Sequence, residues 1–101
     1  MRTLSHLNRI AGGELVAAFG ADPSITSLEL DSSRVPAAGG LFAALPGTRR
    51  HGAEFAADTT AEAILTDRAG HDILREKQET RPVIVVDDVR AILGLVAAEI
   101  H

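Results

Sequence analysis

The chain has 101 residues, 46% of them hydrophobic, a net charge of −4 and no cysteine. This length suits one domain around a single core, and the missing cysteines exclude disulfides and thiolate metal sites. The apolar runs fall far short of the roughly 20 residues of a membrane helix, the N-terminus lacks a signal-peptide pattern, and the acidic balance argues against a nucleic-acid surface.

The first third of the chain predicts one helix and two strands. Behind Thr3, apolar residues recur every third position and a glycine pair follows, which indicates an amphipathic helix over residues 3–11. Strands are expected over 14–19 and 25–30, because their apolar residues flank the turn-forming sequence Gly-Ala-Asp-Pro-Ser.

The middle of the chain predicts a sheet that contains a βαβ unit. Apolar runs over 41–45, 61–66 and 82–86 are typical of strands buried on both faces, and residues 71–79 predict a crossover helix between the last two. This alternation indicates an α/β fold, a small single domain with a mixed or mostly parallel sheet of about five strands flanked by helices.

The apolar spacing of the last segment predicts a helix over 89–100. Asp87 or Asp88 would cap it, and a cap fits this position better than a pair of catalytic carboxylates does. The helix runs to His101 without a glycine or proline stop, so we expect the chain to be cut from a longer one.

The chain lacks the motifs of a self-contained enzyme. Its sole lysine, Lys77, follows Glu76, so a P-loop that cradles ATP is absent, as are the nucleophile elbow, the dinucleotide fingerprint and His-Glu-x-x-His. The four histidines are not at ligand spacing, so no metal site is expected. We therefore expect neither a catalytic residue nor a bound cofactor within this sequence.

The sequence PGTRRHG at residues 46–52 follows a predicted strand, and ligands of open α/β sheets gather at such ends. Its two glycines free the backbone to turn N–H groups toward an anion, Thr48 adds a hydroxyl donor, and Arg49 or Arg50 can neutralise phosphate. This composition favours a diphosphate cradle, with a solvated basic turn as the alternative.

A second polar cluster, LDSSRV at residues 30–35, follows another predicted strand. Its serine hydroxyls and backbone groups can recognise the edge of a base or a sugar, and an ordinary Asp or Ser turn is the alternative. We expect the two turns to meet in space and form one pocket for an anionic nucleotide.

The stretch LDSSRVPAAGGLFAALPGTRRHGAEFA resembles the uridine-diphosphate-binding segment of the Mur ligases. That segment runs roughly Asp-Ser-Arg, a short spacer, Pro-Gly-Asp-Leu-Phe-x-Ala-Leu-x-Gly, then a loop to Asp/His-Gly. The likeness extends to IAGGELV, AEAILTD and PVIVVDDVRAILGLVAAEIH, so it covers nearly the whole chain. The form LPGTRRHG is more similar to the UDP-N-acetylmuramoyl-tripeptide synthetases (MurE type) than to the ligases that add D-Ala-D-Ala.

The resemblance implies that residues 1–101 are the N-terminal domain that holds the UDP end of UDP-MurNAc-L-Ala-D-Glu. The parent would be a cytoplasmic, ATP-dependent ligase that adds diaminopimelate or lysine during peptidoglycan precursor synthesis. ATP and Mg²⁺ would bind outside this chain, in a central domain that a C-terminal domain follows, and neither nucleic acid nor membrane is an expected partner. The alternatives are the same domain of the D-Ala-D-Ala-adding ligase, or a stand-alone nucleotide-binding or interaction module without catalysis.

The resemblance also assigns site residues by matching position. Leu30 and one serine, either Ser32 or Ser33, would face the uracil and the ribose. The residues expected to meet the nucleotide and its diphosphate are Thr48, Arg49 and Arg50.

Overall fold

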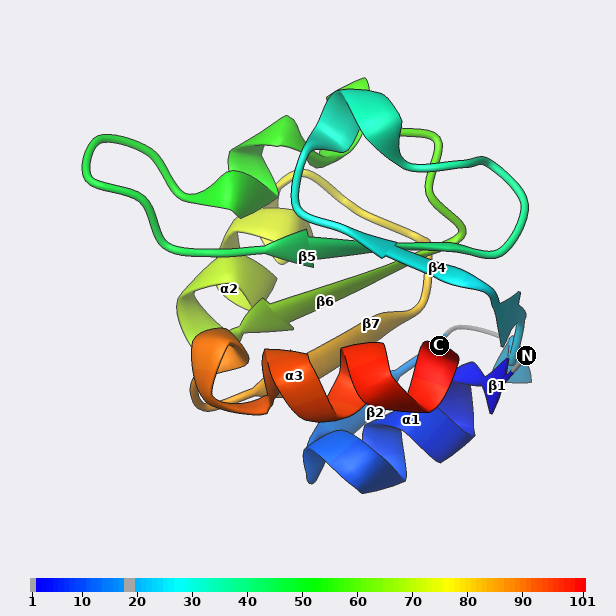
Figure 1. Ribbon diagram of the computed structural model, residues 1–101. Coiled ribbons are helices and arrows are strands. Elements are labelled where there is room, and N and C mark those ends of the chain that lie inside the picture. The colour runs from blue at the N-terminus through cyan, green and yellow to red at the C-terminus, as the bar shows by residue number, and fades with distance from the viewer. Residues whose placement is uncertain (1, 18–19) are drawn as a thin grey trace.

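The computed structural model describes residues 2–17 and 20–101, in which helices and short strands alternate (Figure 1). The strands are β1 (Arg2–Thr3), β2 (Glu14–Val16), β3 (Ser24–Ile25), β4 (Ser27–Glu29), β5 (Gly40–Ala44), β6 (Ala63–Asp67) and β7 (Val83–Val86). Among the described residues the helices are α1 (Leu4–Ala11), α2 (Arg68–Glu76) and α3 (Val89–Ile100), and the 3-10 helices include η2 (Ser32–Arg34) and η3 (Gly52–Asp58).

Five strands form one mixed sheet in the order β2-β7-β6-β5-β4. β4, β5, β6 and β7 run parallel to one another, and β2 is antiparallel to β7 at one edge. β6, α2 and β7 make the predicted βαβ unit. The predicted α/β class with a mostly parallel sheet is therefore confirmed, while the small β1-β3 sheet was not predicted.

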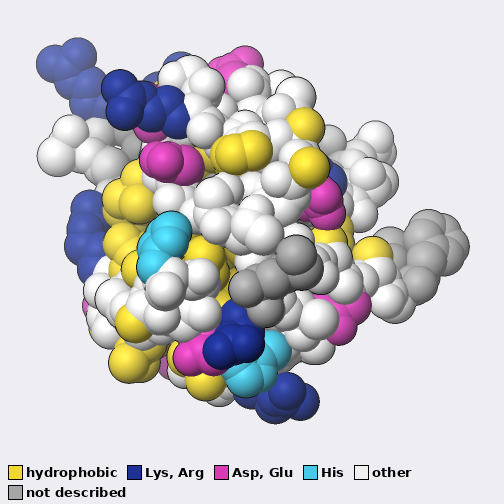
Figure 2. Space-filling model, turned by 45° about the vertical axis from the view of Figure 1, so that its right-hand side comes forward, with side chains coloured by type: hydrophobic (Ala, Val, Ile, Leu, Met, Phe, Trp, Pro, Cys, Tyr) yellow, Lys and Arg dark blue, Asp and Glu magenta, His cyan; other side chains and the backbone are white. Residues whose placement is uncertain are grey.

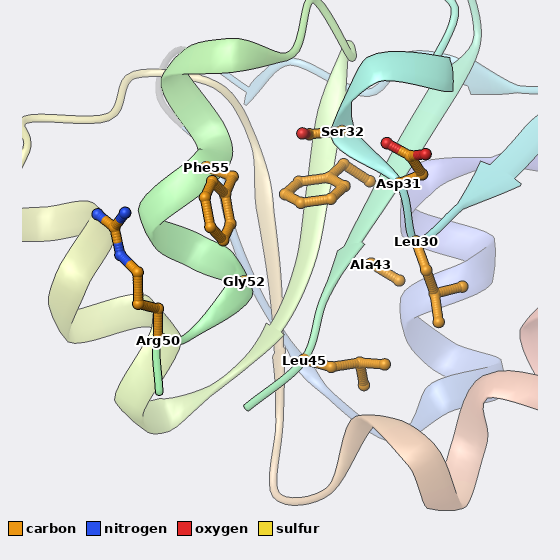
Figure 3. Close-up of a pocket in the computed structure, with 9 residues that line it drawn as sticks. Leu30, Asp31, Ser32, Ala43, Leu45, Arg50, Gly52 and Phe55 are labelled. Atoms are coloured by element: carbon orange, nitrogen blue, oxygen red, sulfur yellow. The ribbon is translucent and has the colours of Figure 1, made fainter. Parts of the chain in front are cut away.

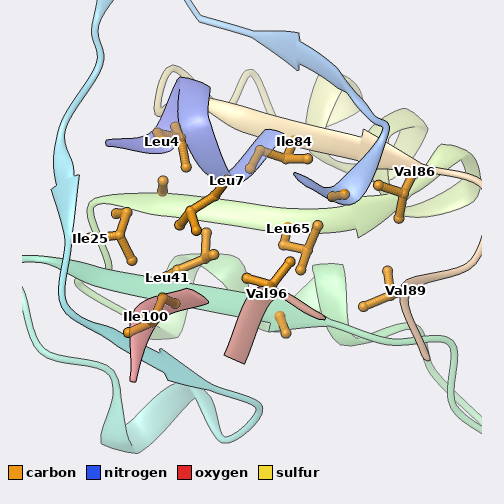
Figure 4. Packing of buried hydrophobic residues seen from close by; sticks show 13 residues of the cluster. Leu4, Leu7, Ile25, Leu41, Leu65, Ile84, Val86, Val89, Val96 and Ile100 are labelled. Atoms are coloured by element: carbon orange, nitrogen blue, oxygen red, sulfur yellow. The ribbon is translucent and has the colours of Figure 1, made fainter. Parts of the chain in front are cut away.

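Helices cover both faces of this sheet, which explains its uninterrupted apolar strands. In β5, Leu41 and Ala43 belong to the cluster under α1 and α3 (Figure 4), whereas Phe42 and Ala44 belong to the cluster under α2 and η3. Successive side chains of a strand point to opposite faces, so a strand with helices on both sides has no position for a solvated polar residue.

The helix ends follow the predicted capping residues. The Thr3 side chain accepts a backbone N–H from the first turn of α1, and Gly12 ends the helix with a φ of +67°. Asp88, rather than Asp87, caps α3, since its carboxylate accepts the Ala91 N–H at 3.4 Å; Asp87 pairs with Arg68 at 3.2 Å. Both residues therefore have structural contacts, as expected of a capping region.

Two predicted strands are shorter than expected. The strand predicted over 14–19 ends at Val16, and residues 18–19 lie outside the described residues. The run 25–30 splits into β3 and β4, because the Gly39 carbonyl accepts the N–H groups of both Thr26 and Ser27. Ile25 can then pair with β1 while the following residues pair with β5.

The crossover helix predicted over 71–79 begins and ends three residues earlier, as α2. The Asp67 carboxylate accepts the Gly70 N–H at 2.8 Å, so Asp67 is an N-cap and not merely the last residue of a strand. Beyond the helix, Gln78 takes a left-handed φ of +59°. In the described ranges, none of the helices has the length and apolar content to cross a membrane.

Candidate functional site

A pocket of about 350 Å³ lies at the carboxyl ends of β4 and β5 (Figure 3). These strands are parallel neighbours, so the turns that follow them emerge at the same edge of the sheet. The lining residues come from β5, from both turns and from η3: Leu30, Asp31, Ser32, Phe42, Ala43, Leu45, Arg50, Gly52 and Phe55. The structure thus brings the two predicted polar turns together in one pocket.

The walls of the pocket are apolar. Leu30 is 49% exposed and Phe55 is 37% exposed, whereas Phe42 is buried. In Figure 3 the Leu30 and Phe55 side chains lie on opposite sides of the pocket. Small-molecule pockets of about 300–1,000 Å³ are typically lined in this way, with a few polar groups that set orientation, so these walls can hold a flat ring.

One end of the pocket is acidic. The Asp31 carboxylate accepts the Ser33 hydroxyl at 2.7 Å and the Ser33 backbone N–H at 3.0 Å. These hydrogen bonds, the hydroxyl first, lower the pKa of Asp31 below its usual 3.8, with a smaller contribution from Arg34. Asp31 is therefore ionised at neutral pH, and its carboxylate can accept N–H or O–H donors from a ligand.

The other end of the pocket is basic. The Arg50 guanidinium lies 5.1 Å from the centroid of the Phe55 ring and its Nε lies 3.6 Å from Glu54 Oε2. In Figure 3, Arg50 and Asp31 are on opposite sides of that ring. An exposed ion pair of this kind contributes only about 0–1 kcal/mol, so Arg50 can exchange Glu54 for a ligand anion at little cost.

Charge is mixed on one face of the molecule. On the face that Figure 2 shows, the basic and acidic side chains are interspersed rather than gathered by sign. With a net charge of −4 for the whole chain, the basic residues near the pocket are a local feature.

The remaining predicted site residues, all in the described part of the chain, lie outside the pocket lining. Thr48 and Arg49 are exposed on the tip of the basic loop, which we define as residues 46–50. The Ser33 hydroxyl donates to the Asp31 carboxylate, and Ser32 is the serine that lines the pocket. Of the six predicted residues, Leu30, Ser32 and Arg50 are brought together.

Asp31, Phe42 and Phe55 line the pocket but were not among the site residues predicted from the sequence. Phe42 lies inside a strand, where a core role is the ordinary interpretation, but Phe55 was detectable as the first large apolar residue after the basic loop. Arg90 at the start of α3 approaches the Pro46 carbonyl oxygen at 3.4 Å, a contact that depends on the fold. Within residues 2–17 and 20–101, no group of three or more His, Asp or Glu side chains is arranged to hold a metal ion.

The chain is similar over most of its length to curated ligases, although no family model matches it. It is 53% identical over 83 residues to the UDP-N-acetylmuramoyl-L-alanyl-D-glutamate--2,6-diaminopimelate ligase of Corynebacterium glutamicum, with 79% of this chain and 16% of the relative covered. The ligase of the same name from Corynebacterium efficiens is 48% identical over 103 residues, covering 98% and 19%. The UDP-N-acetylmuramyl-tripeptide synthetase of Leifsonia xyli is 40% identical over 98 residues, covering 87% and 18%. The chain spans less than a fifth of the length of these relatives.

Proposed function

Because the chain belongs to the Mur ligase family, we propose that residues 1–101 are the N-terminal substrate-binding domain of a ligase that joins 2,6-diaminopimelate to UDP-MurNAc-L-Ala-D-Glu. The names of the two corynebacterial relatives specify diaminopimelate, which favours it over lysine as the added amino acid. The names of the relatives likewise favour this ligase over the one that adds D-Ala-D-Ala and over a stand-alone module.

The observation that carries this proposal is the pocket at the ends of β4 and β5, which has apolar walls, an acidic end and a basic end. Uracil packs between Leu30 and Phe55. The donors of the base and the ribose face Asp31 and Ser32, because a carboxylate and a hydroxyl accept N–H and O–H groups. The diphosphate lies at Arg50, since a like charge disfavours it near the Asp31 carboxylate.

The exposed residues of the basic loop complete the diphosphate site in this proposal. Thr48 adds a hydroxyl donor and Arg49 a second guanidinium, both within two residues of Arg50. Their exposure leaves them accessible to a ligand that extends out of the pocket.

The chain contributes binding and orientation to the reaction. Binding energy from the UDP end, remote from the reacting D-Glu carboxyl, positions the substrate for chemistry elsewhere in the protein. ATP and Mg²⁺ bind the parts of the polypeptide beyond these residues, and the 101-residue chain by itself is inactive. The absence of cysteine is compatible with a cytoplasmic enzyme.

An NMR titration of the chain with UDP tests this function. We expect amide shifts confined to residues 30–35 and 46–55, and a dissociation constant as weak as about 1 mM still supports the proposal, since the whole enzyme shares the diphosphate with another domain. Shifts spread elsewhere, or none at the pocket in saturating UDP, contradict it. Arg75→Ala, an exposed charge removed outside the pocket lining, is the control that keeps the affinity of the native chain.

A further inference from the structure

A histidine–carboxylate pair lies behind the basic loop, outside the pocket lining. His51 Nε2 is 2.8 Å from Asp67 Oδ1, and the two side chains are only 9% and 15% exposed. His51 directly follows the loop, whereas Asp67 is the last residue of β6. The pair therefore joins the loop to β6, which neighbours β5 on the side opposite β4.

Both ring nitrogens of His51 have a partner. Nδ1 accepts the backbone N–H of Ala53 at 2.9 Å, at the start of η3. With Nδ1 as an acceptor, the neutral ring carries its proton on Nε2 and donates it to Asp67. The same Asp67 oxygen accepts the Gly70 N–H at 2.8 Å, so one carboxylate oxygen connects the loop to the first turn of α2.

The His51 ring is also packed tightly. A Cβ added to Gly70 would lie 2.6 Å from His51 Cε1 and would overlap Thr66 Oγ1. Thr66 is buried, and its hydroxyl donates to the Ala44 carbonyl at 3.1 Å, at the end of β5. Asp67 of β6 and the first turn of α2 at Gly70 therefore determine where the ring lies.

The basic loop itself, in contrast, is exposed from Pro46 to Arg50. Backbone contacts join the two ends of the loop: Pro46 forms a β-bridge with His51, and the Gly52 N–H donates to the Leu45 carbonyl at 2.7 Å. These ends are the base of the loop. Two side-chain contacts also hold this base: His51 bonds to Asp67 of the sheet, and the exposed Arg90 of α3 donates to the Pro46 carbonyl at 3.4 Å.

From this geometry we propose that His51 and Asp67 are positioning residues that hold the basic loop in place and thereby strengthen binding of the diphosphate part of the ligand. The assignment rests on the proposed function for the identity of the ligand. A loop that is already ordered loses less conformational entropy when its arginines bind an anion, whereas contacts to the base come from other elements.

Two substitutions separate the proposed contact from the caps that surround it. In His51→Asn the amide oxygen can still accept the Ala53 N–H, as Asp31 accepts the N–H two residues on, but asparagine is too short to reach Asp67. In Asp67→Ser a serine still caps α2 and is too short to reach His51. Asp67→Asn keeps an acceptor oxygen for both donors and is the conservative control.

The test begins without ligand, with ¹⁵N relaxation of the amides of residues 47–50. We expect faster motion there in His51→Asn and in Asp67→Ser, and near-native values in Asp67→Asn. Affinity for UDP should fall about three- to tenfold in the first two variants, as expected when a few side chains must be ordered on binding, with uridine affinity unchanged. The double variant should be no weaker than either single one, because both remove the same contact.

The outcomes distinguish this inference from the proposed function. Unchanged loop relaxation in both variants overturns the positioning role whether or not UDP binds. Equal losses for UDP and uridine overturn it as well, since the pair would then support the pocket as a whole. A loop that loosens in chains that never bind UDP supports the positioning role and removes the ligand assigned to the pocket. If one variant fails to fold, the other gives the same comparison.

Discussion

The two turns that meet at the pocket are held in different ways. In the turn at residues 31–34, Asp31 bonds to Ser33 and pairs with Arg34 at 3.7 Å, all within four residues of sequence. The basic loop depends instead on distant partners, because His51 bonds to Asp67 and Arg90 contacts Pro46. The turn at residues 31–34 is thus stabilised by contacts within its own sequence, and the basic loop by contacts with distant elements. A substitution far from the pocket should therefore disturb the basic loop and leave residues 31–34 unchanged.

Gly70→Ala should have the largest effect, because it should disturb the basic loop and leave the turn at residues 31–34 unchanged. The added Cβ has no room beside Thr66 and His51, so we expect unfolding in urea to show a loss of about 1–3 kcal/mol, the usual cost of overpacking. Amide shifts should move in the basic loop and not at residues 31–34. Gly94→Ala in α3 is the matched control, since nothing lies within 4 Å of its Cβ position, and it should instead stabilise the helix by up to about 1 kcal/mol.

Arg50→Ala should have the next largest effect, on binding rather than on stability. Loss of a charge-assisted hydrogen bond to phosphate should weaken UDP about tenfold. Uridine should lose less, because it lacks phosphate and keeps its contacts with Leu30. Calorimetric titration with both ligands measures the difference, and equal losses for the two would contradict a diphosphate role. Replacing Arg49 as well should widen the difference.

Ser33→Ala should have the smallest effect, because it should change the turn at residues 31–34 and leave the basic loop unchanged. The hydroxyl of Ser33 is the main cause of the lowered pKa of Asp31, so this variant should raise that pKa toward 3.8, as followed by carboxyl NMR during an acid titration. A lowered pKa means that these hydrogen bonds stabilise the turn above pH 3.8 and are lost as the pH falls through the folded-state pKa. Relaxation in the basic loop should not change, and a change there would show that the turns are coupled.

The same contrast explains how much could be predicted from the sequence. Thr3 and Gly12 around α1 depend on neighbours in the chain, and the prediction of that helix was confirmed. The continuous apolar runs of β5, β6 and β7 likewise predicted their burial, because a strand covered on both faces has apolar residues at successive positions. The α/β class followed from such local patterns.

The errors arose where a distant group acts. The break at Thr26 depends on the Gly39 carbonyl, and sequence spacing does not reveal that approach. Asp67 was assigned no special role in β6, although it caps α2 and bonds to His51. At the pocket, the meeting of the two turns was predictable from strand ends, but the choice of Ser32 over Ser33 required the hydrogen bond to Asp31.

Because Asp31 and Arg50 lie at opposite ends of one cavity, the pocket favours one orientation of a ligand that has different chemical groups at its two ends. A molecule entering backwards would bring phosphate to a carboxylate and leave its hydrogen-bond donors beside a guanidinium, so inversion is disfavoured at both ends. Inorganic pyrophosphate would satisfy one terminus and leave the hydrophobic walls empty. In the proposed UDP complex, selectivity would therefore reside in the order of chemical groups along the ligand, and no single one of those groups would be sufficient for recognition.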